Sequence, residues 1–400
     1  MGRKVILLVL ISFLLGWIPL AGAAEEESRL KFSGDLRGRF EGFWFERDET
    51  GSRSEDRRRI RYRLRLNAKA TINDHAAVGI RVGTGDINSR SGNQTIGSPV
   101  DFGSNEFDVR QAYLVIMPFA KGELPNRDGH WKIQFGRVPN PFYWKNGKDM
   151  MLIDNDFNPG GISTNFDVAV SEKASIFANI AGFIVDENKA ARDPFFTGFQ
   201  GGIEVELANN LTTGVRGSFY YFDYLDDDFL ERGVDGTGGV TSGGGNVVDG
   251  LTGDPNGGNL QVVETQAFLK LGSWPVFAFG GFSSNLSAEP SQEFSVEEEN
   301  IAYNAGLEGG DKKKNVHLGL AYFFIEANAF PSQYIDSDLF DGRTNRKGFF
   351  FYGTRQLLAG ADFGIKLFAS DAIETDLAAF TPSVEDSERI RLQVDLIYEF

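Results

Sequence analysis

The most distinctive chemical feature of the sequence is a run of five arginines at alternate positions. Arg57, Arg59, Arg61, Arg63 and Arg65 alternate with positions that are apolar from residue 60 onward. A period of two indicates a β-strand, because successive side chains of a strand point to opposite faces. The guanidinium groups therefore share one face, where they could pair with carboxylates or attract anions.

Energetics decide which way this face points if the strand crosses a membrane. An arginine at the lipid-facing midplane costs about 2–4 kcal/mol, so several together would forbid that orientation. The charged face must then point inward, as a ladder roughly 26 Å long. Such a ladder is tolerable in a water-filled lumen or beside acids. Two interpretations stay open, a basic wall lining a pore and structural salt bridges to acids such as Asp35 or Glu41.

Other residue types exclude several functions. The 400 residues contain no cysteine, which excludes a disulfide scaffold, a Cys-ligated metal centre and a thiol nucleophile. His75, His130 and His317 are far apart in the sequence and give no convincing nucleophile–base pair, so we expect neither an enzyme nor a cofactor. A net charge of -16 argues against nucleic-acid binding, which needs a basic excess.

The elements that must position the arginines are strands throughout. Period-two alternation recurs in about sixteen segments, joined alternately by short turns and long polar loops. An even strand number and this long–short alternation are typical of a transmembrane antiparallel β-barrel, whereas a soluble β-sandwich gives no reason for them. We therefore predict an all-β protein. The expected strands are 30–46, 57–72, 76–86, 107–117, 131–138, 160–170, 174–185, 198–208, 211–222, 260–271, 276–283, 300–309, 316–327, 347–354, 361–369 and 389–400.

The first residues predict export from the cytoplasm. Arg3 and Lys4 precede an apolar run over residues 5–20 and a small-residue site that ends at Ala23. This pattern is typical of a secretory signal peptide over residues 1–23, cleaved near Ala23; an uncleaved anchor is the alternative. Residues 24–400 would then form a single outer-membrane barrel.

Four short stretches resemble a known family. Residues 154–161 and 336–342, together with residues 107–118 and Phe135-Gly136-Arg137, are similar to Gram-negative outer-membrane porins, and in particular to the broad family described as putative porins. The resemblance implies passive diffusion of small hydrophilic solutes or ions, and a homotrimer by analogy. It also implies that the third external loop, residues 139–159, folds into the barrel as a constriction.

The expected constriction sets loop acids against a basic wall. Asp149, Asp154 and Asp156 of that loop would face the arginines and could give a modest preference for anions. The alternative is that Asp154 and Asp156 only cap or brace the loop. The candidate wall comprises Arg39, Arg57, Arg59, Arg61, Arg63, Arg65 and Arg81, which Arg37, Arg389 and Arg391 could enlarge once the barrel closes.

The remaining signals concern partners. Tyr398 and the terminal Phe400 resemble the signal by which the barrel assembly machinery recognises outer-membrane proteins. The acidic loops, above all the Gly-rich residues 223–259, could hold divalent cations that bridge to lipopolysaccharide. Asp226, Asp227 and Asp228 are a weak candidate for a calcium site, and the alternative is that they are ordinary solvated loop charges.

Two alternative functions stay open. A binding or adhesion barrel with an occluded lumen is the first, and an outer-membrane hydrolase that uses His317 is the second.

Overall fold

The computed structural model describes most of the chain beyond the predicted signal peptide. The described residues are 29–45, 56–85, 91–97, 107–119, 130–144, 147, 150–187, 192–208, 210–226, 245–247, 251, 257–272, 275–291, 297–374 and 388–400. The predicted signal peptide, Asp149, Asp227 and Asp228 lie outside them. Within these ranges no helix is long and apolar enough to cross a membrane.

The described residues form one antiparallel sheet of sixteen long strands and one very short strand. The strands are β1 Leu30–Phe45, β2 Arg57–Asn73, β3 Ala76–Thr84, β4 Gln94–Thr95, β5 Phe107–Ile116, β6 His130–Arg137, β7 Gly160–Ser171, β8 Ala174–Ile184, β9 Phe195–Ala208, β10 Leu211–Asp226, β11 Gly257–Leu271, β12 Val276–Asn285, β13 Ile301–Gly310, β14 His317–Ile325, β15 Arg346–Leu358, β16 Ala361–Ala372 and β17 Glu388–Glu399.

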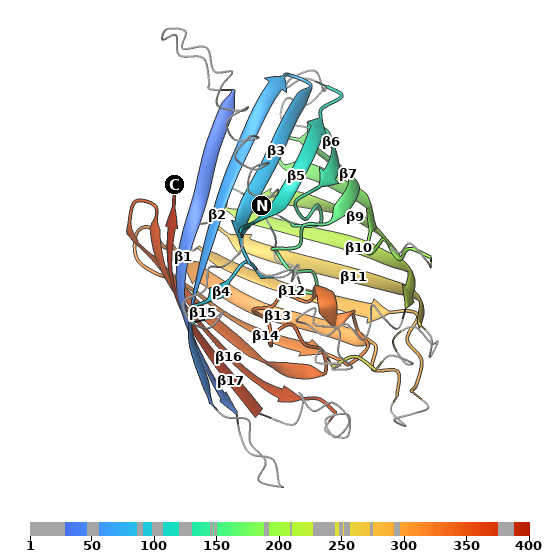
Figure 1. Cartoon of the computed structure of the whole chain (residues 1–400), viewed down its shortest axis with the longest axis vertical. Helices are drawn as coiled ribbons and strands as arrows, with labels where there is room; N and C mark the ends of the chain where they lie inside the picture. The colour runs from blue at the N-terminus through green and yellow to red at the C-terminus, as the bar shows by residue number, and fades with distance from the viewer. Residues whose placement is uncertain are drawn as a thin grey trace, which may run out of the picture.

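The sheet closes on itself, because β1 pairs with both β2 and β17 (Figure 1). The closing seam is continued by Phe400, whose backbone exchanges hydrogen bonds of 2.8 and 3.1 Å with Gly34. Closure removes the sheet edges that would otherwise expose unpaired backbone groups. The predicted fold class, a β-barrel of about sixteen strands, is confirmed.

Alternation along the strands separates an apolar exterior from a polar interior. Leu36 and Ile60 are 48 % and 57 % exposed, whereas Arg37 and Arg39, the alternate residues of β1, are 7 % and 1 % exposed. The period-two pattern thus gives apolar side chains to the outside and charged ones to the lumen, as a membrane barrel requires.

The short strand β4 was not predicted, because two residues carry no periodicity. Beyond the end of β3 at Thr84, β4 continues in the same direction along β2 and pairs with Arg61 and Tyr62. The segment thereby brings Asn93 to the inner face of the barrel beside Arg37. The hydrogen-bonded edge of β2 is covered by this means.

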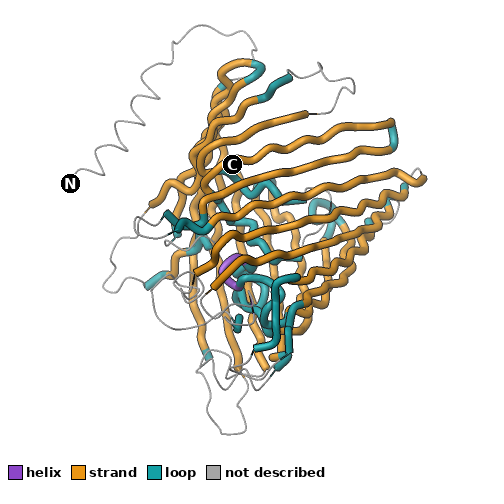
Figure 2. The backbone as a smooth tube through the Cα atoms, turned by 90° about the vertical axis from the view of Figure 1, so that its right-hand side faces the viewer, coloured by secondary structure: helices purple, strands orange, loops and turns teal. Residues whose placement is uncertain are grey.

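The interior of the barrel is partly filled by connecting segments. Residues 138–144 and 150–159 follow β6, residues 326–345 follow β14, and the latter include the 3-10 helix η1 Ser332–Tyr334. Figure 2 shows these segments and η1 within the ring of strands. The main apolar core lies here, inside the barrel, between the two segments and the inner faces of β8–β16.

Candidate functional site

The arginines of β2 face carboxylates of β1 across the seam. Asp35 lies opposite Arg65 in the register of the two strands, and it accepts hydrogen bonds from Arg65 (2.6 Å) and Arg63 (2.8 Å). Both arginines are mostly buried by the wall and the inward-folded segments. The pairing offsets the cost of holding guanidinium groups away from bulk water.

Glu41 is the second acid of this wall and is fully buried. It lies opposite Arg59 and pairs with it at 2.5 Å, and Arg61 reaches the same carboxylate at 3.4 Å. From the other side of β1, Arg391 of β17 donates to Glu41 at 2.7 Å, and Arg39 lies 3.5 Å away. One carboxylate therefore neutralises charge from three strands.

A second set of acids comes from the segment 326–345. Asp338 pairs with Arg39 (2.6 Å) and Lys366 (2.8 Å), while Asp341 pairs with Arg391 (2.8 Å). Burial opposes ionisation of Asp338, but Arg39, Lys366 and Arg391 outweigh it and hold the pKa of Asp338 well below its usual range. These ion pairs fasten the segment to the inner faces of β1, β2 and β17, which carry the arginines and are called the arginine-bearing wall below.

The turn that presents these acids is conformationally strained. Phe340, Asp341 and Gly342 all have positive φ, at 48°, 61° and 73°. Only glycine adopts this region at no steric cost, so Phe340 and Asp341 each need compensation from their surroundings. Phe340 obtains it by burial against Phe323, and Asp341 by its ion pairs with two arginines. This backbone conformation orients the Asp341 carboxylate toward Arg389 and Arg391.

The segment 139–159, which directly precedes β7, also contacts the arginines of β2. Asp156 binds Arg65 at 2.8 Å and Arg63 at 3.3 Å. Burial opposes its ionisation, but Arg63 and Arg65 outweigh it, so the pKa of Asp156 lies below its usual value. The prediction set the loop acids across an open gap from the arginines; the structure instead brings Asp156 into direct contact with them.

Asp154 is turned away from the arginines and braces the two segments. Its carboxylate accepts backbone hydrogen bonds from Asp156 (2.6 Å) and Ser337 (2.8 Å). Burial, with the carboxylates of Asp336 and Asp156, raises its pKa well above the usual value. For Asp154 the bracing role given as the alternative describes the observed contacts.

Aromatic packing and a side-chain amide hold the segment 139–159 against the inner faces of β8 and β9. Phe142 and Phe157 pack on Phe183 and Phe196 with ring centroids 5.9–6.5 Å apart. Gln200 of β9 donates to the carbonyl of Phe142 at 3.0 Å. These contacts join residues far apart in sequence, and together they fix the segment inside the barrel.

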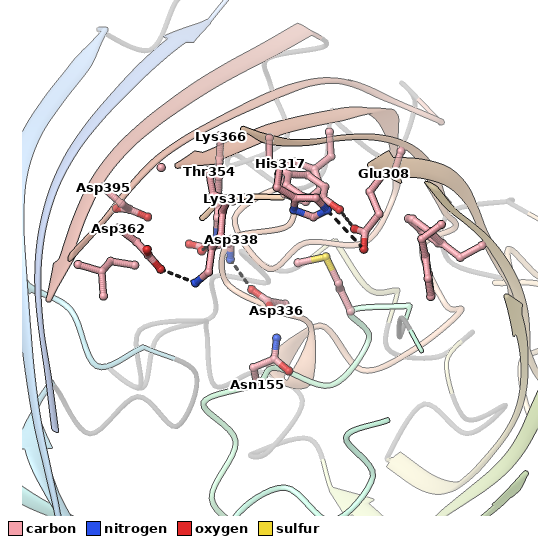
Figure 3. A pocket seen from close by; sticks show the side chains of 18 of the residues that line it. Asn155, Glu308, Lys312, His317, Asp336, Asp338, Thr354, Asp362, Lys366 and Asp395 are labelled. Atoms are coloured by element: carbon pink, nitrogen blue, oxygen red, sulfur yellow. Dashed lines mark hydrogen bonds and ion pairs between the residues drawn. The ribbon is translucent and has the colours of Figure 1, made fainter. Parts of the chain in front are cut away.

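A cavity of about 880 Å³ remains between the arginine-bearing wall, the two segments and β11–β16. Its charged lining is nearly balanced. The cations are Arg37, Arg63, Arg65, Lys270, Lys312 and Lys366, and the acids are Asp154, Asp156, Glu308, Asp336, Asp338, Asp362 and Asp395. Figure 3 shows Lys366 directed at Asp338, Lys312 at Asp362, and His317 beside Glu308.

The other predicted residues lie apart from this cavity. Arg57 is exposed at the far end of the ladder, and Arg81 donates to Asn67 at 2.6 Å. Tyr398 is 48 % exposed and its ring stacks near that of Phe400 at the end of the seam. Asp226 ends β10, and the described residues hold no group of three acids or histidines placed to bind a metal ion.

Sequence reasoning missed three acids that pair with the arginines, namely Asp338, Asp341 and Asp395, and it missed Lys366, which shares Asp338 with Arg39. Asp395 of β17 pairs with Arg39 at 2.6 Å. The alternation of β17 carried a signal for Asp395, because it shares a face with Arg391. For Asp338 and Asp341 the sequence offered only a short acidic stretch, and nothing local showed that it folds inward.

A carboxylate near the outer end of β13 gives a pH-dependent stability. Burial, then the carboxylates of Glu326, Glu374 and Glu297, raise the pKa of Glu299 to about 7. An unfolded glutamate titrates near about 4.3, so the folded state binds the proton more tightly, and the resulting stability is present below about pH 4 and lost as pH rises through 7. We expect Glu299→Gln to raise the melting temperature at pH 8 and leave it unchanged at pH 4. Equal shifts at both pH values would contradict this interpretation.

Comparisons with known proteins agree with this architecture. Residues 49–229 match the profile of a family described as "Putative porin". OprB of Pseudomonas putida is 9 % identical with a TM-score of 0.55, over 93 % of this chain and 94 % of that one. OmpF of Salmonella typhi is 12 % identical with a TM-score of 0.53, over 93 % and 97 %. No curated protein matches the sequence. The chain therefore has the fold of outer-membrane porins and resembles, over residues 49–229, the putative porin family.

Proposed function

We propose that the protein is an outer-membrane porin, a channel for passive diffusion of small hydrophilic solutes or ions. The observation that carries this proposal is the lumen itself, which holds a charged cavity of about 880 Å³ within a closed barrel. A barrel of about sixteen strands is wide enough to contain water. The family match and the porin fold favour a channel over an enzyme.

The two inward-folded segments would set the size limit of this channel. They contact both the apolar inner faces of β8–β16 and the arginine-bearing wall, so the solute path runs through the cavity that they leave beside β11–β17. Most arginines of this wall are already paired with acids, so a preference for anions would depend on the few that are not. We expect such a preference to be modest.

The expected setting completes the proposal. The apolar exterior suits outer-membrane lipid, with lipopolysaccharide at the long-loop end. Cleavage near Ala23, recognition of Tyr398 and Phe400 by the assembly machinery, and a homotrimer belong to this proposal as well.

Solute uptake by vesicles tests the channel. Proteoliposomes that contain the purified barrel should swell in isotonic arabinose and more slowly in larger sugars, because the segments narrow the lumen. Heat-unfolded protein, which loses the barrel, is the control. Vesicles with correctly folded protein that swell no faster than protein-free vesicles would contradict the proposal.

A further inference from the structure

One arginine of the luminal wall differs from its neighbours in its partners. Arg37 of β1 is 7 % exposed and lines the cavity. Its Nη2 donates to Asn93 Oδ1 at 2.6 Å, and its Nε is buried without an acceptor. Among the residues that the structure describes, no carboxylate lies within ion-pair distance of it.

Two other cations on the same cavity, Arg63 and Lys366, are paired with carboxylates. Arg63, directly opposite Arg37 in the register, binds both Asp35 and Asp156. Lys366, on the same cavity, binds Asp338. A buried guanidinium is stable when a planar anion accepts its hydrogen bonds, and a carboxylate fits its geometry. Arg37 therefore presents a guanidinium group whose charge an anionic solute could neutralise.

The cavity wall away from Arg37 is aromatic. Phe277 and Phe279 of β12, Phe323 of β14, and Phe350 and Tyr352 of β15 line it. Phe350 and Tyr352 stack with centroids 4.9 Å apart, and Phe277 and Phe279 lie 6.0 Å apart. Such rings favour an aromatic ligand in offset or edge-to-face contact. The cavity volume also lies within the range of about 300–1,000 Å³ that is usual for small-molecule sites.

We propose that the lumen binds aromatic monocarboxylates, with the carboxylate on Arg37 and the ring toward the wall of β12–β15. This inference rests on the proposed channel and names its preferred solute class. A second carboxylate on the solute would meet Asp156 or Asp338, which border the same cavity. The site therefore selects solutes that carry one negative charge and one aromatic ring.

The test is block of single-channel current by benzoate in planar bilayers. Benzoate should interrupt the potassium chloride current at concentrations at which acetate and benzamide do not, because acetate lacks the ring and benzamide lacks the charge. Arg37→Gln should weaken the apparent affinity for benzoate at least about tenfold. Lys132→Gln is the matched control, since Lys132 shares the inward face of β6 with Gln134 but does not line the cavity.

Each outcome bears on one claim. A folded protein that gives no current contradicts the channel itself. A conducting channel that benzoate blocks no better than acetate, or blocks equally in Arg37→Gln and the parent protein, overturns the inference alone. If Arg37→Gln does not fold, Arg37→Lys retains the charge but loses the two-pronged geometry, and it should still weaken block; undiminished block in Arg37→Lys then overturns the assignment.

Discussion

Replacing Asp338 by asparagine should release the segment 326–345 from the wall and increase the conductance of the channel. The substitution leaves Arg39, Lys366 and Arg391 without the carboxylate that they share. Breaking a buried ion pair from one side costs about 3–5 kcal/mol. Arg39 retains Asp395 and Arg391 retains Asp341, but both guanidinium groups stay buried with less negative charge around them. We expect a fall of this size in the free energy of unfolding, measured by urea titration in lipid vesicles, together with larger and noisier single-channel current.

Asp362→Asn is the matched control for this prediction. Asp362 also pairs with a lysine, Lys312, but that lysine side chain is 42 % exposed. Exposed pairs contribute about 0–1 kcal/mol, so the control should change neither stability nor current appreciably. Equal effects of the two substitutions would show that Asp338 does not anchor the segment.

Glu41→Gln should destabilise the barrel as strongly but leave the current close to that of the parent protein. Glu41 is fully buried and pairs with Arg59, Arg61 and Arg391, so its loss removes the carboxylate that Arg59 and Arg61 share, while Arg391 retains Asp341. The segment 326–345 keeps its own acids, and thus its place in the lumen. The expected fall in unfolding free energy is again about 3–5 kcal/mol.

The double variant distinguishes a shared network from two independent sites. Glu41 and Asp338 both contact Arg391 and Arg39, so their effects on unfolding free energy should not add. Strict additivity within about 0.5 kcal/mol would indicate that the two acids act separately. A current increase in Glu41→Gln equal to that of Asp338→Asn would contradict the assignment of the anchor to Asp338.

The strands could be predicted because their signal is local. Alternation between Arg57 and Ile72 specifies a strand and the face that holds the arginines, without reference to any other segment. The observed β2, Arg57–Asn73, differs from the expected 57–72 by one residue. Strand ends were less certain where bulges occur, and β10 continues to Asp226, past the irregularity after Phe222.

The resemblance implied that residues 139–159 enter the lumen, but the second segment, 326–345, and the contacts of both could not be predicted, because they join distant parts of the chain. The ion pair of Arg39 with Asp338 joins residues 299 positions apart. Phe142 and Phe157 pack inward only because β8 and β9 place Phe183 and Phe196 opposite them. Such pairings require the closed barrel, which fixes register and separation together. The same closure pairs the arginines with acids, a possibility that the sequence left open.

The most direct measurement of the central claim is the single-channel conductance of the purified, folded protein in planar bilayers. We predict uniform stepwise current in potassium chloride, and larger steps for Asp338→Asn than for Asp362→Asn. Folded protein that adds no current to the bilayer would contradict a solute path through the cavity beside the two inward-folded segments.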